Sequence, residues 1–280
     1  MAEKGLYLRF PGGKAKALTF SYDDGVKEDK RLAKLFLEKG LKCTFNLNSS
    51  LIPTTEEDNK ARKHPKLTWN ELNELFKSGL FEVACHSATH PLLTACTDSV
   101  VLDEVLFDRR ALEGNFKRIV KGMAYPYGPT DDRIMALLKS AGIVYSRTVT
   151  STRDFSIPNE WLKWNPTCHH NSPDMERLIA EFLAVKPNRD AKAFYIWGHS
   201  YEFTDNDNWS VIENIAEKLS GCDDIFYATN MEIYKAVENF RRLEFSADGK
   251  TVYNPCCEPV WAAKPNSEAF KIEAGQTVNL

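Results

Sequence analysis

The chain has 280 residues, of which 43% are hydrophobic, so it is long enough to bury one large core. Its 36 basic and 39 acidic residues give a net charge of −3 without any run rich in lysine and arginine, which argues against a nucleic-acid partner. No apolar run is long enough to span a bilayer, which argues against a membrane span.

The N-terminal segment 1–10 lacks the apolar centre of a signal peptide. We therefore expect a cytoplasmic protein, or a secreted one if a leader has been removed. The seven cysteines are odd in number and form no C-x-x-C pair, and the neighbours Cys256 and Cys257 suit a reducing compartment. We expect the thiols to be free.

Short strand-like runs alternate with helical segments along most of the chain, which is the pattern of a parallel α/β fold. Two of the helical segments, 29–38 and 69–77, are followed by Gly40 and Gly79, the residue type that commonly ends a helix. The predicted strands are 17–22, 43–48, 81–86, 122–127, 143–149, 193–199 and 225–229.

Residues with reactive side chains follow the ends of several of these strands: Asp23, Asp24, His86, Tyr127 and His199. A closed barrel brings the loops after its strands to one site, whereas an open sheet collects residues from fewer strands. The chain also lacks a glycine-rich phosphate loop. We therefore predict a distorted (β/α)7 TIM-like barrel.

From about residue 243 the sequence changes to short β-like segments around two turns, Asp248-Gly249 and Ala274-Gly275. We predict two hairpins, at 244–253 and 270–279. The domain prediction is a barrel of residues 1–242 and a small C-terminal β appendage of residues 243–280 packed on it. Its expected role is to cover hydrophobic surface, and the oligomeric state is left open.

Two histidines four residues apart, His86 and His90, follow an apolar strand-like run. This spacing suits metal ligation, and a hydrolytic metal needs a third ligand and open positions for water and substrate. Asp23 and Asp24 supply carboxylates at another strand end, where one can ligate the metal while the other faces the water. The alternative is a capping turn at the aspartates and hydrogen-bonded histidines in the core.

These motifs, with the Tyr-Pro-Tyr-Gly segment at 125–128, resemble the first three motifs of the polysaccharide deacetylase family, also called carbohydrate esterase family 4 or the NodB-homology fold. The resemblance covers residues 16–234. It implies that Asp24, His86 and His90 bind a divalent metal, usually zinc, and that Asp23 is the catalytic base. The metal would lower the pKa of its bound water from about 15.7 toward about 7, and Asp23 would take the proton.

The resemblance also implies two further roles. The backbone N–H of Tyr127 would stabilise the oxyanion, and His199, at the end of the run 194–199, would be the general acid. We expect Trp197 to belong to the core because it lies within the same run. The predicted function is a metal-dependent hydrolase that removes N- or O-linked acetyl groups from a carbohydrate.

The chain departs from the family pattern at two places. The family commonly has an arginine where this chain has Ala124, and Arg147 on the following strand is a candidate to replace it beside Asp23. The fourth motif, an aspartate with a tryptophan, is not clear, and Asp154 and Trp164 are the nearest residues of those types.

Cys168, His169 and His170 form a further cluster, which we expect to line or flank the pocket. A second metal site is the alternative, but no partner ligand stands at an indicative spacing. Tyr201 and Glu202 follow His199 closely, so they either contact substrate, orient the acid, or belong to a solvated loop.

Two other functions remain open. The same fold, by family likeness, hosts amidases that act on small molecules, and the missing arginine allows a pseudoenzyme that binds sugar without hydrolysing it. The presence of every predicted acid, base and metal ligand favours the deacetylase. The sequence does not separate N-acetyl from O-acetyl substrates, nor polymers from small sugars.

Overall fold

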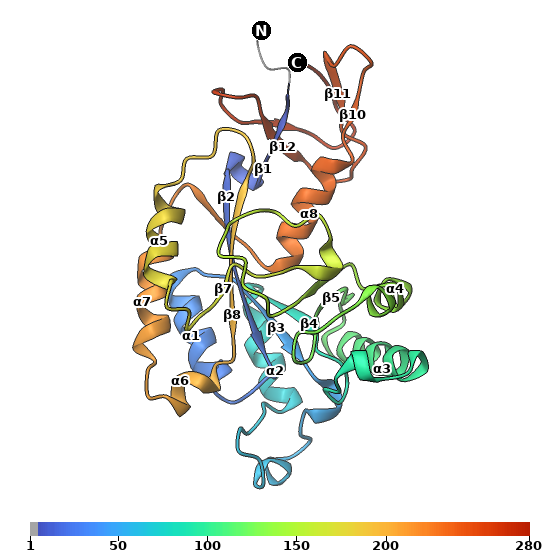
Figure 1. The fold of residues 1–280 in the computed structure, drawn as a ribbon, viewed down its shortest axis with the longest axis vertical. Helices are drawn as coiled ribbons and strands as arrows, with labels where there is room; N and C mark the ends of the chain where they lie inside the picture. Colours follow the sequence, from blue (N-terminus) through green and yellow to red (C-terminus); the bar gives the residue numbers. More distant parts are fainter. Residues whose placement is uncertain (1–4) are drawn as a thin grey trace.

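The computed structural model describes residues 5–280 (Figure 1). Residues 1–4 lie outside that range. They belong to the segment 1–10, from whose composition we expected no signal peptide. Parallel strands and helices alternate as predicted. The parallel strands are β2 (Lys16–Asp23), β3 (Cys43–Leu47), β4 (Phe81–Cys85), β5 (Gly122–Ala124), β6 (Tyr145–Arg147), β7 (Cys168–His169), β8 (Lys192–Gly198) and β9 (Ile225–Tyr227). The helices are α1 (Asp29–Lys39), α2 (Trp69–Leu75), α3 (Asp98–Phe116), α4 (Asp132–Ser140), α5 (Met175–Ala184), α6 (Tyr201–Asp205), α7 (Ser210–Leu219) and α8 (Asn230–Arg241).

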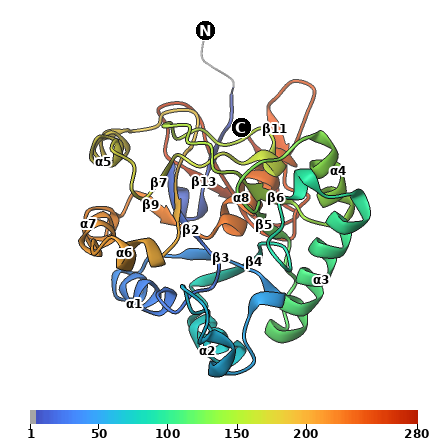
Figure 2. The same ribbon diagram turned by 60° about the horizontal axis from the view of Figure 1, so that its bottom comes forward.

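The parallel strands form one curled sheet in the order β6-β5-β4-β3-β2-β8-β7, with β9 paired to β2. Helices α1 to α7 lie around the outside of this sheet (Figure 2). A curled parallel sheet surrounded by helices is the architecture of a distorted barrel. The predicted fold class is therefore confirmed.

The barrel is irregular at two places. Strand β9 pairs with residues 16–18 of β2, while β3 pairs with residues 20–23 on the same edge, so two strands share one side of β2. Opposite this, β6 and β8 are joined by the segment 164–169, which bridges to Arg147 and supplies the short strand β7 beside β8. Strand β7 was not predicted, because two residues carry too little periodicity to detect.

Strand β2 is buried along its whole length, and its two faces differ. Because side chains alternate along a strand, one face is apolar and the other polar. Phe20 packs against Phe36 of α1, with ring centroids 4.7 Å apart. Ser21 and Asp23 point the other way and accept hydrogen bonds from Asn46 of β3, at 2.8 and 2.7 Å. The barrel interior is therefore polar near the end of β2.

Both predicted helix stops are present. Helix α1 ends at Gly40, with φ of 64°, and the turn after α2 ends at Gly79, with φ of 73°. Glycine adopts this left-handed conformation at little steric cost. Both helices therefore begin where the sequence indicated, and α1 also ends there, whereas α2 ends at Leu75 and a 3-10 turn continues to Ser78.

The appendage contains two antiparallel sheets, built from β1 (Tyr7–Arg9), β10 (Glu244–Phe245), β11 (Thr251–Tyr253), β12 (Val260–Ala263), β13 (Phe270–Ile272) and β14 (Thr277–Asn279). Strands β10 and β11 form the first predicted hairpin. The second hairpin was wrong, since β13 pairs with β12 and β14 pairs with β11. The buried Asn254 amide donates to the carbonyls of Ile272 and Glu273, which stabilises the crossing of the chain between sheets.

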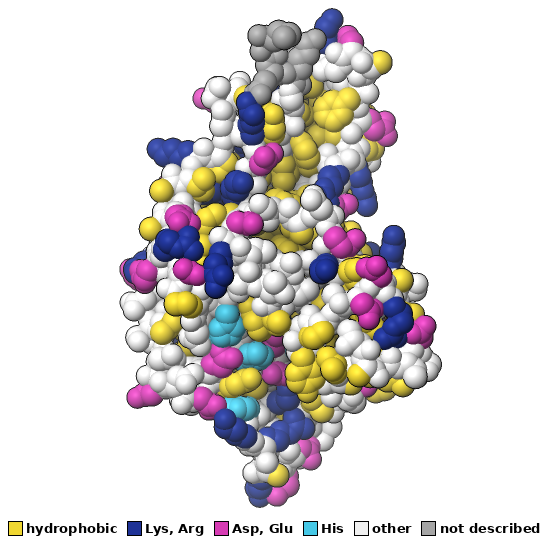
Figure 3. Space-filling view, in the orientation of Figure 1, with side chains coloured by type: hydrophobic (Ala, Val, Ile, Leu, Met, Phe, Trp, Pro, Cys, Tyr) yellow, Lys and Arg dark blue, Asp and Glu magenta, His cyan; other side chains and the backbone are white. Residues whose placement is uncertain are grey.

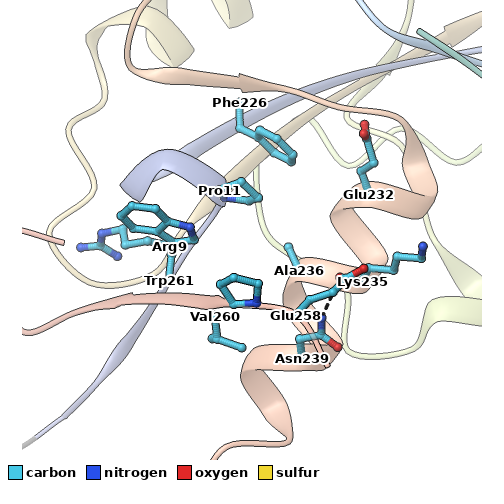
Figure 4. A pocket seen from close by; sticks show the side chains of 11 residues that line it. Arg9, Pro11, Phe226, Glu232, Lys235, Ala236, Asn239, Glu258, Val260 and Trp261 are labelled. Atoms are coloured by element: carbon cyan, nitrogen blue, oxygen red, sulfur yellow. Dashed lines mark hydrogen bonds between the residues drawn. The ribbon is translucent and has the colours of Figure 1, made fainter. Parts of the chain in front are cut away.

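Strand β1 joins the appendage by pairing with β12, so residues from both parts of the sequence build it. The predicted boundary after residue 242 stays a prediction. Trp261 and Phe226 are among the residues that line a hollow between α8 and β12 (Figure 4). Its volume is about 370 Å³. Asn239 of α8 donates to Glu258 across it, at 3.3 Å. The appendage lies above α8 in Figure 1, at the opposite end from the carboxyl ends of the barrel strands.

Within residues 5–280, no helix is both long and apolar enough to cross a membrane. All seven cysteines carry free thiols, as expected. Cys43, Cys85 and Cys168 are buried, where thiols pack as small apolar groups.

Candidate active site

The predicted site residues converge at the carboxyl ends of the barrel strands. Asp23 ends β2, His86 follows β4, Tyr127 follows β5, and His199 follows β8. Their cavity has a volume of about 480 Å³ and is lined by Asp23, Asp24, His86, His90, Tyr125, Tyr127, Val149, Trp197, His199 and Tyr201. Figure 3 shows histidine side chains gathered with acidic ones in the lower half of the face in view.

Asp24, His86 and His90 form one ligand cluster, with one ligand atom of each lying within 4.8 Å of the others. His86 Nδ1 lies 2.8 Å from the carbonyl oxygen of Ala124, a contact that needs a proton on Nδ1 and leaves the lone pair on Nε2. Burial lowers the pKa of His86 to about 4 and lowers that of His90, so both imidazoles are neutral at pH 7. Neutral imidazoles beside a carboxylate suit a divalent metal.

The carboxyl of Asp24 is ionised despite its burial. Burial alone would raise its pKa, but Lys66 and the nearby histidines lower it to about 2. Lys66 Nζ lies 2.7 Å from the Asp24 carbonyl oxygen and 3.3 Å from Oδ1. Lys66 was not predicted, because the loop that carries it has no spacing relation to the aspartates.

The backbone of the cluster is strained. Asp24, Ser87, His90 and Tyr127 have φ of 81°, 59°, 63° and 61°. Side chains other than glycine rarely adopt this left-handed region, and such residues concentrate at functional sites. These residues form sharp turns directly after β2, β4 and β5, and the turns place the side chains of Asp24, His90 and Tyr127 at the cavity.

Asp23 is almost fully buried and is fixed by two donors. Arg147 Nη2 donates to Oδ2, and the Asn46 amide donates to Oδ1. Although burial raises the pKa of Asp23, Arg147 and then His86 lower it below its ordinary value. Arg147 on β6 therefore supplies the cation that Ala124 does not, as the sequence suggested. Asn46 was missed, although polar residues alternating in the run 43–48 were a usable signal.

His199 is held by Glu202, with Nδ1 and Oε1 3.0 Å apart. Its Nε2 lies 3.8 Å from Asp23 Oδ2. Burial lowers the pKa of His199, but Glu202 and Asp23 outweigh it and raise the pKa above its ordinary value. Glu202 thus orients His199, one of the alternatives that the sequence left open.

His169 and His170 flank the cavity, as expected, and both reach Glu202. Their Nε2 atoms lie 3.1 and 2.9 Å from Glu202 Oε2. Trp197 lies beside them, 9% exposed, with its ring 4.7 Å from that of His169. The guanidinium of Arg147 lies 4.3 Å from the Trp197 ring, so this tryptophan is mostly core but also lines the cavity.

Aromatic side chains surround the mouth of the cavity. Tyr127 is 63% exposed, and its ring meets that of His90 edge-on at 4.6 Å. Tyr201 stacks on His64 at 4.0 Å. With His64, all six histidines of the chain lie in or around this site.

The two residues considered for the fourth motif lie apart from this chemistry. Trp164 is buried in the core against Tyr145 and Tyr195. Asp154 is exposed, and it accepts a hydrogen bond from the backbone of Ser156. The residue that contacts His199 is Glu202, not Trp164 or Asp154.

Residues 11–146 match the family model described as polysaccharide deacetylase. Curated relatives include the poly-β-1,6-N-acetyl-D-glucosamine N-deacetylases of Staphylococcus aureus strains MSSA476 and N315, each 31% identical over 104 residues. The match covers 31% of this chain and 35% of each relative. The chain therefore spans about a third of the length of these relatives.

The fold also occurs among solved structures. A candidate polysaccharide deacetylase from Mycobacterium smegmatis aligns with a TM-score of 0.62 and 14% identity, over 86% of this chain and 96% of that one. IcaB from Ammonifex degensii aligns with a TM-score of 0.50 and 15% identity, over 59% of this chain and 72% of that one. At these identities the similarity concerns the fold.

Proposed function

Because residues 11–146 make the chain a member of the polysaccharide deacetylase family, we propose that it is a metal-dependent hydrolase that removes acetyl groups from a carbohydrate. The observation that carries the proposal is the convergence of an aspartate pair and three histidines on one cavity. These side chains come from three different strand ends, and an ion-pair partner or hydrogen bond fixes several of them.

Asp24, His86 and His90 would hold the metal, and we propose zinc. Their donor set fits: one ionised carboxylate and two neutral imidazoles, with the His86 ring oriented through Ala124. Bound zinc would supply Lewis acidity to the acetyl carbonyl and lower the pKa of water.

Asp23 would act as the base. Arg147 and Asn46 hold its carboxyl in place, and Arg147 contributes to keeping it ionised. An ionised carboxylate that faces the cavity can take a proton from the attacking water. Because these partners are buried with it, Asp23 needs little reorganisation during the step.

His199 would act as the acid. The raised pKa, due to Glu202 and Asp23, favours the protonated imidazole that must give its proton to the departing amine or alcohol. The backbone N–H of Tyr127, in the turn after β5, would donate to the developing oxyanion.

The substrate proposal is an acetylated carbohydrate with an N-acetyl or O-acetyl group. The names of the curated relatives describe an N-deacetylase of poly-β-1,6-N-acetyl-D-glucosamine, which supports N-acetylated sugars as the first test. The exposed Tyr127 ring offers a flat apolar surface beside the cavity.

The test is acetate release from a panel of N- and O-acetylated sugars, using metal-stripped protein with and without restored zinc. We expect release that depends on zinc, and the preferred sugar names the substrate class. Small amides in the same panel test the amidase alternative. Sugar binding without acetate release over a long incubation would contradict the proposal and favour a pseudoenzyme.

A further inference from the structure

Beside His199 lies a second group of potential ligands. His169 and His170 sit at the end of β7, and Glu202 lies in the first turn of α6. One ligand atom of each lies within 4.8 Å of the others. The exposed fractions of the His169 and Glu202 side chains are 26% and 23%, so solvent ions can reach the group, whereas the His170 side chain is fully buried.

His170 is built into this position. Its ring stacks on Tyr22, with centroids 5.7 Å apart, and contacts Phe203 at 4.2 Å. Gly198 leaves the space for it, since a Cβ there would lie 2.0 Å from His170 Nδ1. The imidazole is therefore fixed by packing, with Nε2 close to Glu202.

The contact between His170 and Glu202 is short but poorly aligned for a hydrogen bond. Nε2 lies 2.9 Å from Oε2, yet neither ring nitrogen has a hydrogen-bond partner. At that distance the missing requirement is alignment, so the nitrogen does not point in line at the oxygen. A buried imidazole without a partner is costly, and this ring needs a further atom near Glu202 to satisfy it.

We propose that His169, His170 and Glu202 form a second divalent-cation site, separate from the Asp24 cluster. Two imidazole nitrogens and one carboxylate oxygen are the ligand types that zinc takes, with an open position for water. Glu202 Oε2 serves this site while Oε1 stays with His199 Nδ1, at 3.0 Å. The carboxylate thus connects the second cation to His199.

A cation on Oε2 draws electron density from the carboxylate that holds His199. Zinc beyond the first equivalent is therefore expected to slow acetate release. This consequence rests on the proposed function, whereas the site itself does not.

The test is the stoichiometry of Zn²⁺ binding to the metal-stripped full chain by equilibrium dialysis. We expect two equivalents for the parent protein, one for Asp24→Ala, one for His170→Ala and none for the double variant. His64→Ala is the matched control, because it removes a histidine outside both clusters and should keep both equivalents. Repeating the titration with Co²⁺ detects binding to the free cysteines, since thiolate ligation gives a separate charge-transfer absorption.

Loss of one imidazole nitrogen could also unfold the buried segment, so His169→Ala, at a more exposed ring, repeats the test. A single equivalent in the parent protein, or two equivalents retained by a folded His169→Ala variant, would overturn the second site. Acetate release without a second equivalent refutes this inference alone. A second equivalent without acetate release refutes the proposed function alone.

Discussion

The two histidine clusters beside His199 are held in different ways. In the first, the turns after β2 and β4 aim the side chains, and a backbone carbonyl orients His86. In the second, aromatic packing fixes His170, and the carboxylate comes from a helix after a different strand. Hydrogen bonding therefore specifies the first cluster, whereas shape specifies the second. Substitutions should affect the two clusters independently.

Asp23→Asn should have the largest effect on turnover. It removes the base but keeps the volume, so kcat for acetate release should fall by about 10²–10⁴ while the zinc content of the first cluster is unchanged. Asp154→Asn, at an exposed carboxyl, is the control and should keep the parent rate. Turnover of Asp23→Asn at the parent rate would show that Asp23 is not the base.

His90→Ala should separate the clusters by metal affinity. Removing a residue that only hydrogen-bonds to a metal ligand typically weakens metal binding by roughly 10- to 100-fold. Loss of the ligand His90 itself should weaken zinc binding at the first cluster by more than that. His170→Ala should leave that affinity unchanged. The measurement is competition with a chromophoric chelator, and equal weakening by both variants would mean that the clusters act as one site.

Gly198→Ala should act on the second cluster through packing. The added methyl group collides with the His170 ring, so we expect a loss of about 1–3 kcal/mol in the free energy of unfolding. Urea unfolding measures it. Gly221→Ala is the control, because a Cβ there meets no atom within 4 Å. It measures the stability lost when a glycine with positive φ is replaced without a collision. An equally large loss there would refute the packing explanation.

Glu202→Gln should have the smallest effect, a shift in the pH profile. Glu202 contributes to the raised pKa of His199, and the neutral amide removes that charge, so the pKa of His199 falls. The acid works only when protonated, so the alkaline limb of acetate release should move to lower pH. Glu213→Gln, on the exposed surface of α7, should leave it in place. If the alkaline limb of the pH profile did not move in Glu202→Gln, Glu202 would not be what raises the pKa of His199.

Strand ends were the most informative feature of the sequence. The spacing of His86 and His90 and the paired aspartates predicted one cluster, and the structure brings these side chains together. Their roles in catalysis remain predictions. Arg147 was also found from the sequence, because its strand neighbours the one that lacks the family arginine.

The features that the sequence did not predict depend on contacts between segments that no periodic pattern relates. Glu202 reaches His169 and His170 from more than thirty residues away, and no spacing rule connects the end of a strand to a helix at that distance. The pairing of β13 and β14 with different sheets was missed because a Gly turn resembles a hairpin whichever strands it joins. Hydrogen bonds from Asn254 to Ile272 and Glu273 stabilise the observed pairing, and the sequence carries no signal for them.

The pairing of β1 with β12 also has a consequence for the order of folding. Residues 7–9 meet residues 261–263, so this ladder closes a loop that contains almost the whole chain. Ordering such a long loop first would cost chain entropy that no contact yet offsets, whereas a formed barrel already holds the two segments near each other. We therefore expect the ladder to form after the barrel, so that weakening it would speed unfolding more than it would slow folding.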